Sequence, residues 1–347
     1  MGVRIGGLVV RERRDGSRGA ASDIPTGSAL QAASPSVAFP VMQPIDPDSV
    51  EALTQLWARV QQDEPRAVLA PWFVHTCHGR LSTVDTAELR GNLVVRYQWN
   101  AHDAPVYSLF GTQDLERTAV ELLAGIRGLG HDPVVRQVSE QQSQILRSVP
   151  GLRIDREPER DEYVLDTTRH SALDGHTYKR MRYAIRHLTE QHRGRIEVRM
   201  VDAADPDELA MIESVLLAMP NSSQRTGNDN DAWESACLAT FFRNPIGAPV
   251  RMFVIEIDGS VKGVGVFELA VGHSAVVFHI LRTDSRYEGL VDFGVWVLAQ
   301  AASRQGIAEL NLEEDLGLPG LRRKKEHLHP ARMITHYTLR PATGSEI

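Results

Sequence analysis

The sequence predicts an α/β fold with two domains, each a mixed sheet flanked by helices. Three observations support this prediction. The chain has 347 residues, a length that suits two domains. Segments with the two-residue period of a strand are interspersed with segments that have the period of a helix. The dipeptide Asp258-Gly259 separates two strand-like runs, which is a strong hairpin signal.

Composition excludes several classes of protein and site. The chain has ordinary globular proportions, with 42% hydrophobic and 24% charged residues, and its net charge of −7 argues against a general nucleic-acid coat. The two cysteines argue against a disulfide framework and a cysteine-based zinc site. No run approaches the roughly 18 apolar residues of a membrane span. We therefore expect a cytoplasmic protein without stable membrane insertion, and we expect no metal.

The chain divides into three predicted sections. Residues 1–48 are rich in small residues, proline and arginine, and we expect a flexible tail there. Residues 49–160 should form the first domain, which begins with a helix over 49–62. Strands are predicted over 92–99, 105–110 and 133–139. A helix between the last two should be capped by Thr112 and end within 128–130.

Residues 161–347 should form the second domain and carry the main site. A strand over 195–201 is followed by a helix with Asp205 as N-cap and Glu208 completing a capping-box pattern. The remaining predicted elements are a helix over 231–242, strands over 250–257, 261–270 and 274–281, a helix over 290–305, a strand over 308–313, a short helix and a strand over 332–341. This order is the layout of a GNAT-type acyltransferase domain. The first half repeats it less distinctly, so we expect a tandem of GNAT-like domains.

The segment 173–195 predicts a helix with one apolar and one basic face. Its core-facing stripe should consist of Met181, Ala184, Ile185 and Leu188. Lys179, Arg182 and Arg186 fall on the other side. A solvated surface helix is the plain interpretation, but these cations lack acids at i+4, and phosphate binding would explain them.

The segment NLEEDLGLPGLRRKKEHLHP, residues 311–330, holds its acids and its bases apart. Its acids follow a predicted strand, and its bases begin the next helical turn. Ligands gather beyond the carboxyl ends of strands in open α/β sheets. Two interpretations stay open here: an ordinary loop with a charged surface helix, or a site that binds an ammonium at one end and phosphates at the other.

The junction at 286–294 is where GNAT enzymes carry a phosphate-cradling glycine loop at a helix N-terminus. Arg286 and Gly289 fit that pattern, but Val291 replaces its final small residue. The match to a coenzyme A loop is therefore incomplete. The histidines, including His279 within a strand, show no metal-ligand spacing, and the sequence has no nucleophile elbow or P-loop.

Several of these segments together resemble the C-terminal domain family of phosphatidylglycerol lysyltransferases. The similar stretches are DEYVLD, LDGHTYKRMRYAIRHL, RYEG, LNLEEDLGLPGLRRKKEHLHP and HYTL. The most specific family pattern falls on Asn311, Glu313, Asp315, Gly317, Gly320, Leu321, Arg322, Lys325 and Pro330. The family's Lys-Arg pair falls on Lys179 and Arg180, but Met181 stands where many members have asparagine.

The resemblance implies a tandem GNAT fold and an aminoacyl-tRNA donor, with no further cofactor. Glu313 and Asp315 are then the expected catalytic acids, which would bind the α-ammonium or act as base. The other expected substrate contacts are Asn311, Glu314, Lys179, Arg180, Arg322, Lys325, Tyr287 and Gly289. The expected tRNA contacts are Arg182, Arg186, Arg323 and Lys324. The family's membrane-embedded region is missing from this sequence, so we expect a small-molecule acceptor, as in natural-product biosynthesis.

Two other functions stay open at this point. An acyl-CoA-dependent N-acyltransferase of the same fold is favoured by Arg286 and Gly289 and opposed by Val291. A non-catalytic module that binds tRNA or another ligand would use the same charges without turnover.

Overall fold

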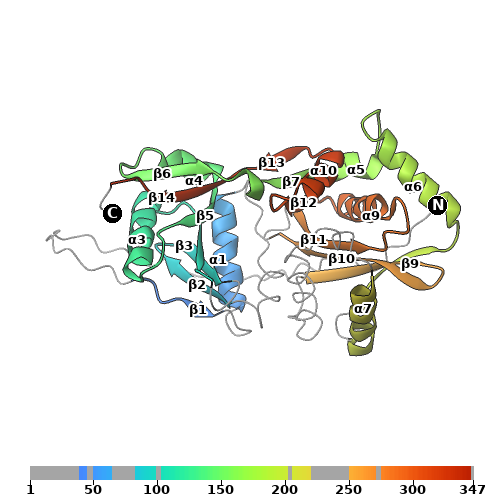
Figure 1. Ribbon diagram of the computed structural model, residues 1–347, viewed down its shortest axis with the longest axis horizontal. Coiled ribbons are helices and arrows are strands. Elements are labelled where there is room, and N and C mark those ends of the chain that lie inside the picture. The colour runs from blue at the N-terminus through green and yellow to red at the C-terminus, as the bar shows by residue number, and fades with distance from the viewer. Residues whose placement is uncertain are drawn as a thin grey trace, which may run out of the picture.

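The computed structural model describes residues 39–44, 50–64, 83–98, 103–201, 205–219, 250–270 and 275–344. Within these ranges the chain forms two seven-stranded sheets with helices packed on them (Figure 1). The predicted α/β class with mixed, helix-flanked sheets is confirmed. The helix expected over 231–242 lies outside the described residues. None of the helices described has the length and apolar character needed to cross a bilayer.

The first sheet has the strand order β1-β2-β3-β4-β5-β14-β6. Its strands are β1 (Gln43–Pro44), β2 (Thr83–Leu89), β3 (Asn92–Gln98), β4 (Val106–Phe110), β5 (Val135–Ser139), β6 (Leu152–Arg156) and β14 (His336–Pro341). Only β4 and β5 run parallel. The helices that accompany this sheet are α1 (Val50–Asp63), α3 (Leu115–Gly128) and α4 (Glu140–Leu146).

The second sheet has the order β13-β7-β12-β11-β10-β9-β8. Its strands are β7 (Glu162–Asp166), β8 (Ile196–Met200), β9 (Val250–Ile257), β10 (Ser260–Leu269), β11 (Ala275–Thr283), β12 (Glu309–Glu314) and β13 (Arg332–Ile334). Here β11 and β12 are the parallel pair. The accompanying helices are α5 (Thr167–Ala172), α6 (Lys179–Gln191), α7 (Pro206–Ala218), α9 (Leu290–Arg304) and α10 (Pro319–His327).

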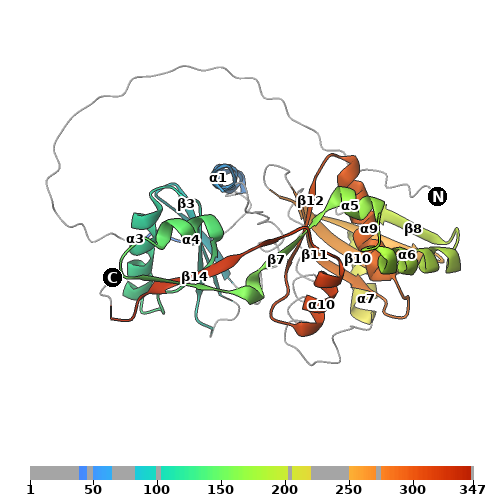
Figure 2. The same cartoon turned by 90° about the horizontal axis from the view of Figure 1, so that it is seen from above.

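The two sheets repeat one pattern and exchange a strand. In each, a three-strand meander is followed by a helix, a parallel strand, a short helix and an edge strand. This pattern covers β2 to β6 in the first sheet and β9 to β13 in the second. After β6 the chain crosses through the 3-10 turn Pro158–Arg160 and inserts β7 between β12 and β13. After β13 it returns and inserts β14 between β5 and β6, as Figures 1 and 2 show.

This exchange changes one expectation directly. We expected a single strand over 332–341, but the segment forms two strands in different sheets, separated at Thr335. The last strand of the expected second domain therefore lies in the first sheet. The division after residue 160 itself stays a prediction, although the chain does pass from one sheet to the other there.

Three apolar clusters hold the layers together. One is shared between the sheets and combines α1, β2 and β3 with α7, β9 and β10. A second packs α6 and α9 against the second sheet. The third packs α3 and α4 against the first sheet and includes Leu339 of β14. The expected core-facing stripe of α6 is confirmed for Met181, Ile185 and Leu188, which are buried, whereas Ala184 is half-buried.

Helix boundaries follow local capping, with two differences from expectation. The side chain of Asp205 accepts hydrogen bonds from the amides of Asp207 and Glu208, so the predicted N-cap of α7 is confirmed. The Glu208 carboxylate bonds Arg199 instead of closing a capping box. The predicted cap of α3 at Thr112 is wrong: the helix begins at Leu115 after Asp114, which has a left-handed backbone.

Part of the expected flexible tail is structured. β1 pairs with β2, and Phe39 packs edge-on against Tyr107 with ring centroids 6.0 Å apart. The Phe39 ring also occupies the space where a Cβ on Gly125 would lie. Phe39 and Met42 explain this, because their apolar side chains pack against the third cluster.

The exchanged strand gives a stability test. Leu339→Ala should lower the free energy of unfolding by about 2–5 kcal/mol, because Leu339 is fully buried. Met333→Ala, at a 39% exposed position of β13, is the matched control and should change it by less than about 0.5 kcal/mol. Amide hydrogen exchange in Leu339→Ala should accelerate in β5 and β6. Acceleration confined to β7 and β12 would contradict the exchange.

Candidate active site

The parallel strands β11 and β12 separate beyond their first residues. Only Ala275 to Val277 pair with Glu309 to Asn311, although β11 continues to Thr283 and β12 to Glu314. The second halves of these strands are therefore not paired with each other, and we call the region between them, at the carboxyl end of the parallel pair, the opening. This is the region of an α/β sheet where ligands commonly bind.

Two β-bulges lie beside this opening. On β11, Phe278 pairs with Phe267 and Ile280 pairs with Val266, so His279 is the extra residue. On β12, the register shifts between Asn311 and Glu314. Bulges commonly redirect side chains beside active sites. In this case they bring His279 Nδ1 within 2.8 Å of Glu313 Oε1.

The bulge on β12 holds Glu313 in a left-handed conformation, with φ of 60°. Such a backbone is uncommon for a residue other than glycine and needs support from its surroundings. Asn311 provides support, because its Oδ1 accepts the Glu313 amide at 2.8 Å while its Nδ2 donates to the Glu162 carboxylate. Asn311 is thus a scaffold for the bulge.

Lys325 of α10 binds the same bulge from the other side. Its ammonium donates to the backbone carbonyls of Leu312, Glu313 and Glu314 at 2.5, 3.2 and 2.5 Å. It also lies 5.9 Å from the centroid of the Tyr163 ring. Burial lowers the pKa of Lys325, which the surrounding carboxylates oppose. All three donors of this ammonium are therefore directed at the strand, where we had expected contacts to an ester or a phosphate.

Asp315 is buried and surrounded by donors. Tyr163 donates to it at 2.6 Å, Arg322 donates from Nε at 2.7 Å and from Nη2 at 3.0 Å, and the Gly317 amide donates at 2.9 Å. Burial would raise the pKa of Asp315, but the bonds from Arg322 and Tyr163 lower it. This environment suits a structural anchor between β7, β12 and α10 better than a proton acceptor.

His279 lies between two carboxylates. Besides Glu313, the carboxylate of Glu268 on β10 approaches Nε2 at 3.5 Å. The His279 side chain is 1% exposed and that of Glu313 is 31% exposed. Burial opposes protonation of the imidazole, but the two carboxylates overcome it and raise the pKa of His279 to about 10. The imidazolium in turn holds the pKa of Glu313 below its usual value despite burial.

A second polar group connects this site to the first sheet. Arg160, in the crossing between β6 and β7, donates to Glu314 at 3.0 Å. Burial raises the pKa of Glu314, and the neighbouring Glu313 adds to the effect. The charges of Arg160 and Glu314 also reach Tyr97 of β3, whose pKa is raised chiefly by burial. His336 of β14 bonds Glu162 at 2.7 Å.

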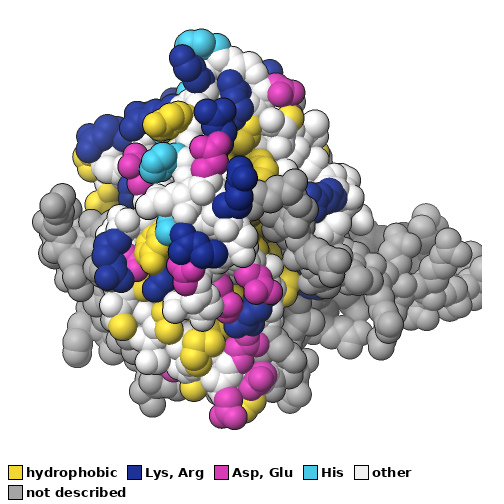
Figure 3. Space-filling model, turned by 90° about the vertical axis from the view of Figure 1, so that its right-hand side faces the viewer, with side chains coloured by type: hydrophobic (Ala, Val, Ile, Leu, Met, Phe, Trp, Pro, Cys, Tyr) yellow, Lys and Arg dark blue, Asp and Glu magenta, His cyan; other side chains and the backbone are white. Residues whose placement is uncertain are grey.

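The α6 cations have different environments. Lys179, Arg180 and Arg186 are exposed, whereas Arg182 donates to the carbonyls of Leu173 and Gly175 and closes the turn before the helix. Arg186 lies 3.5 Å from Glu190, so the expected absence of an acid at i+4 is wrong at this position. Arg323 and Lys324 of α10 are also exposed. Figure 3 shows Lys and Arg side chains gathered in the upper part of this end of the molecule, where Figure 1 places α6, and acidic ones lower down.

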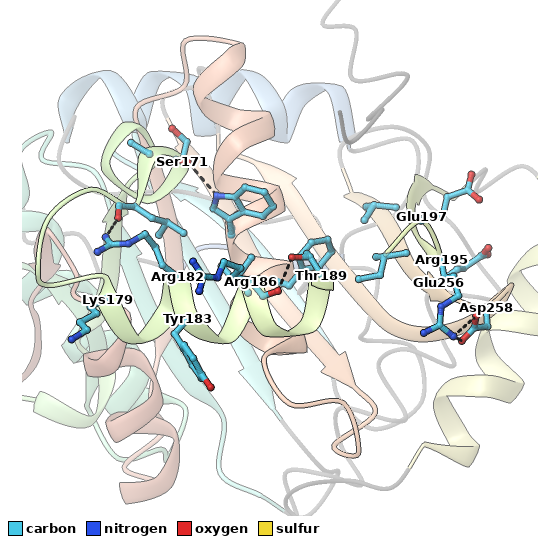
Figure 4. Close-up of a pocket in the computed structure, with 18 of the residues that line it drawn as sticks. Ser171, Lys179, Arg182, Tyr183, Arg186, Thr189, Arg195, Glu197, Glu256 and Asp258 are labelled. Atoms are coloured by element: carbon cyan, nitrogen blue, oxygen red, sulfur yellow. Dashed lines mark hydrogen bonds and ion pairs between the residues drawn. The ribbon is translucent and has the colours of Figure 1, made fainter. Parts of the chain in front are cut away.

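A hollow of about 1070 Å³ runs beside α6 (Figure 4). Lys179, Arg182 and Arg186 line it along the helix, and Glu197, Glu256 and Asp258 lie toward its other end. Trp296 of α9 contributes to the hollow and donates to the Ser171 carbonyl at 3.1 Å. This hollow therefore differs in place and lining from the opening between β11 and β12.

The loop at residues 286–289, where the sequence suggested a phosphate-binding loop, contacts other parts of the protein. Gly289 has φ of 82°, and a Cβ there would lie 2.6 Å from the Ala184 carbonyl oxygen of α6. Arg286 is bound to Asp284, with Nη2 to Oδ2 at 2.6 Å. Tyr287 packs beneath Lys262, whose ammonium is 5.7 Å from the ring centroid. The close approach that glycine permits is therefore used by α6.

The structure thus brings together only part of the expected site. Asn311, Glu313, Glu314, Asp315, Arg322 and Lys325 form one cluster around the end of β12. The cations of α6, together with Tyr287 and Gly289, lie on other elements, although Arg180 comes close enough to Asp292 of α9 to oppose the rise that burial causes in its pKa. Sequence reasoning missed His279, Glu268 and Arg160. Two of these could have been noticed in the sequence, because Glu268 and His279 are ionisable residues within otherwise apolar strands.

The support for the bulge can be tested by removing one ammonium. Lys325→Met keeps the length of the side chain but leaves the carbonyls of 312–314 without their donor. We expect a loss of roughly 3 kcal/mol in the free energy of unfolding, measured by urea denaturation. Lys324→Met, at the exposed neighbouring position, should change it by less than about 0.5 kcal/mol. Equal effects of the two variants would contradict the scaffold role.

Comparisons with known proteins agree with this architecture. The sequence model described as "Phosphatidylglycerol lysyltransferase, C-terminal" matches residues 81–340. Among solved structures, a conserved protein of unknown function from Bacteroides thetaiotaomicron superposes with a TM-score of 0.71 at 17% identity, covering 88% of this chain and 100% of that one. Comparison with curated proteins gave no match.

Two further structures carry lysylphosphatidylglycerol synthetase names. The C-terminal domain of a putative synthetase from Agrobacterium fabrum has a TM-score of 0.55 at 14% identity, with 82% and 91% of the two chains covered. L-PGS from Bacillus licheniformis has a TM-score of 0.53 at 14% identity, with 87% and 94% covered. The likeness confirms the expected GNAT-type acyltransferase fold. Because the family match spans most of the sequence, the chain belongs to the phosphatidylglycerol lysyltransferase C-terminal family.

Proposed function

We propose that the protein transfers an aminoacyl group from a charged tRNA to a hydroxyl or amine of a small-molecule acceptor. The observation that carries this proposal is the family match over residues 81–340, which includes the motif that builds the opening between β11 and β12. A role in natural-product biosynthesis fits such an acceptor and belongs to the same proposal.

The reaction needs no covalent enzyme intermediate, because an aminoacyl ester is already activated. The acceptor oxygen or nitrogen attacks the acyl carbon, the bond from that carbon to the ribose oxygen breaks, and the acceptor's proton is transferred to the ribose oxygen. The protein must position both reactants and assist this proton transfer. Glu314 is the carboxylate that we propose for the proton, because burial raises its pKa toward the working range.

The exposed cations supply the proposed tRNA contacts. Lys179, Arg180 and Arg186 are exposed on α6, and Arg323 and Lys324 are exposed on α10, so all five belong to helices that accompany the second sheet. Salt-sensitive contacts between such cations and phosphates dominate nucleic-acid affinity. Arg182 is not included, because it is bound to the turn before α6.

Coenzyme A is the less favoured donor. In a coenzyme A site the glycine loop would have to bring its backbone to the pyrophosphate. Here the Ala184 carbonyl lies against Gly289, and Asp284 holds Arg286. The close approach at Gly289 is therefore taken up by α6, and Arg286 is already paired with a carboxylate.

The donor can be identified directly. The protein is incubated with a small-molecule extract and with each of the twenty tRNAs charged with labelled amino acid, or with labelled acetyl-CoA. We expect label to pass from one or a few charged tRNAs to a small product, and RNase pretreatment to abolish the transfer. Turnover that survives RNase, or label arriving from acetyl-CoA, would contradict the proposal. Binding of tRNA without any product would instead indicate a non-catalytic module.

The proposed tRNA contacts can be tested in the same assay. Arg180→Glu should raise the KM for charged tRNA on the order of tenfold and make it less salt-dependent, because it replaces a phosphate contact by a like charge. Arg153→Glu, a charge reversal at an exposed position of β6, is the matched control and should leave KM unchanged. Equal effects would show that only net charge matters.

A further inference from the structure

We propose that His279 is a positioning residue, a buried imidazolium that keeps Glu313 ionised and turned into the opening, so that Glu313 binds the α-ammonium of the aminoacyl donor. The inference rests on the proposed function for the identity of the donor. It also assigns one of the two roles that the sequence left open for Glu313.

The geometry carries this inference. His279 is the extra residue of the β11 bulge and Glu313 lies in the β12 bulge, so each strand departs from regular pairing where the two side chains meet. A shift of either bulge by one residue would move its side chain to the opposite face. The 2.8 Å contact uses Oε1 of Glu313, and among the described residues none donates to Oε2.

The neighbouring charges do not compete for that oxygen. Glu314 is paired with Arg160, Glu162 is bound by His336, and the Lys325 ammonium is directed at three carbonyls. Glu268 approaches the far side of the imidazole. Glu313 and Glu314 are both partly exposed, at 31% and 23% of their side chains, and each has one oxygen bound by a cationic side chain. Glu313 is the more exposed of the two, and its bound oxygen faces the buried His279.

Protonation decides which ligand fits. A carboxylate whose pKa lies below the usual range is a weak proton acceptor and a good partner for an ammonium. The charge of His279 should persist through neutral pH and disappear only as the pH approaches about 10. The donor class that follows is an aminoacyl group with a free α-amine.

The test compares donors with and without that amine. In steady-state transfer, wild-type protein should use aminoacyl-tRNA on the order of 10²-fold better than the same tRNA with its amino acid N-acetylated. His279→Gln and Glu313→Gln should each lose most of this preference, through a fall in kcat/KM for the free-amine donor and little change for the acetylated one. His131→Gln, a substitution in the first domain, is the control and should retain the preference.

A second measurement does not depend on turnover. In ¹⁵N-histidine-labelled protein, both His279 nitrogens should remain protonated from pH 6 to 8, whereas an ordinary histidine titrates near 6.5. Glu268→Gln keeps the imidazole but removes one neighbouring carboxylate, so it should lower the pKa of His279. If no charged tRNA is a substrate but His279 is charged, the proposed function fails and the ion pair stands. A neutral His279 at pH 7, or a preference that survives His279→Gln, would overturn the positioning role.

Discussion

The site depends on the contact between one buried ammonium and three consecutive backbone carbonyls. Lys325 binds the oxygens of Leu312, Glu313 and Glu314 and thereby stabilises a strand end that regular sheet pairing could not hold. Buried carbonyls without partners are costly, so this contact favours the bulged conformation. Asn311 binds the Glu313 amide, and Arg322 fixes the following turn through Asp315. Much of the family motif thus stabilises the backbone conformation of one short segment.

The fold places this stretch at a junction between two sheets. Because β7 and β14 are exchanged, the crossing that carries Arg160 lies beside the end of β12, and His336 of β14 reaches Glu162 of β7. The shared cluster of α1 and α7 adds an apolar connection between the sheets. Packed side chains and hydrogen bonds therefore connect both sheets to the carboxylates at the opening.

Much of the fold could be predicted from local patterns. Asp258-Gly259 gives the hairpin of β9 and β10, and Asp205 gives the start of α7. The strand exchange could not be predicted, because β13 and β14 form one continuous extended pattern and only tertiary pairing separates them. The motif residues do lie together around the end of β12, but the contacts of Asp315 and Lys325 depend on the bulge in β12 and on Tyr163 of β7, which is far away in the sequence. Charge segregation between residues 311 and 330 looked like two ends of one ligand site, whereas several of these acids and bases bind each other or the backbone between them.

The arrangement around His279 depends on tertiary structure. A lone histidine in a strand is commonly structural. Here two bulges bring His279 and Glu313 into contact, and no local sequence pattern predicts those bulges. The most direct measurement is a crystal structure with a non-hydrolysable 3′-aminoacylamino-3′-deoxyadenosine. The predicted result places the ligand's α-ammonium about 3 Å from Oε2 of Glu313, with His279 still on Oε1. An ammonium bound elsewhere, for example to Glu197 or Glu256 in the hollow beside α6, would contradict the central claim.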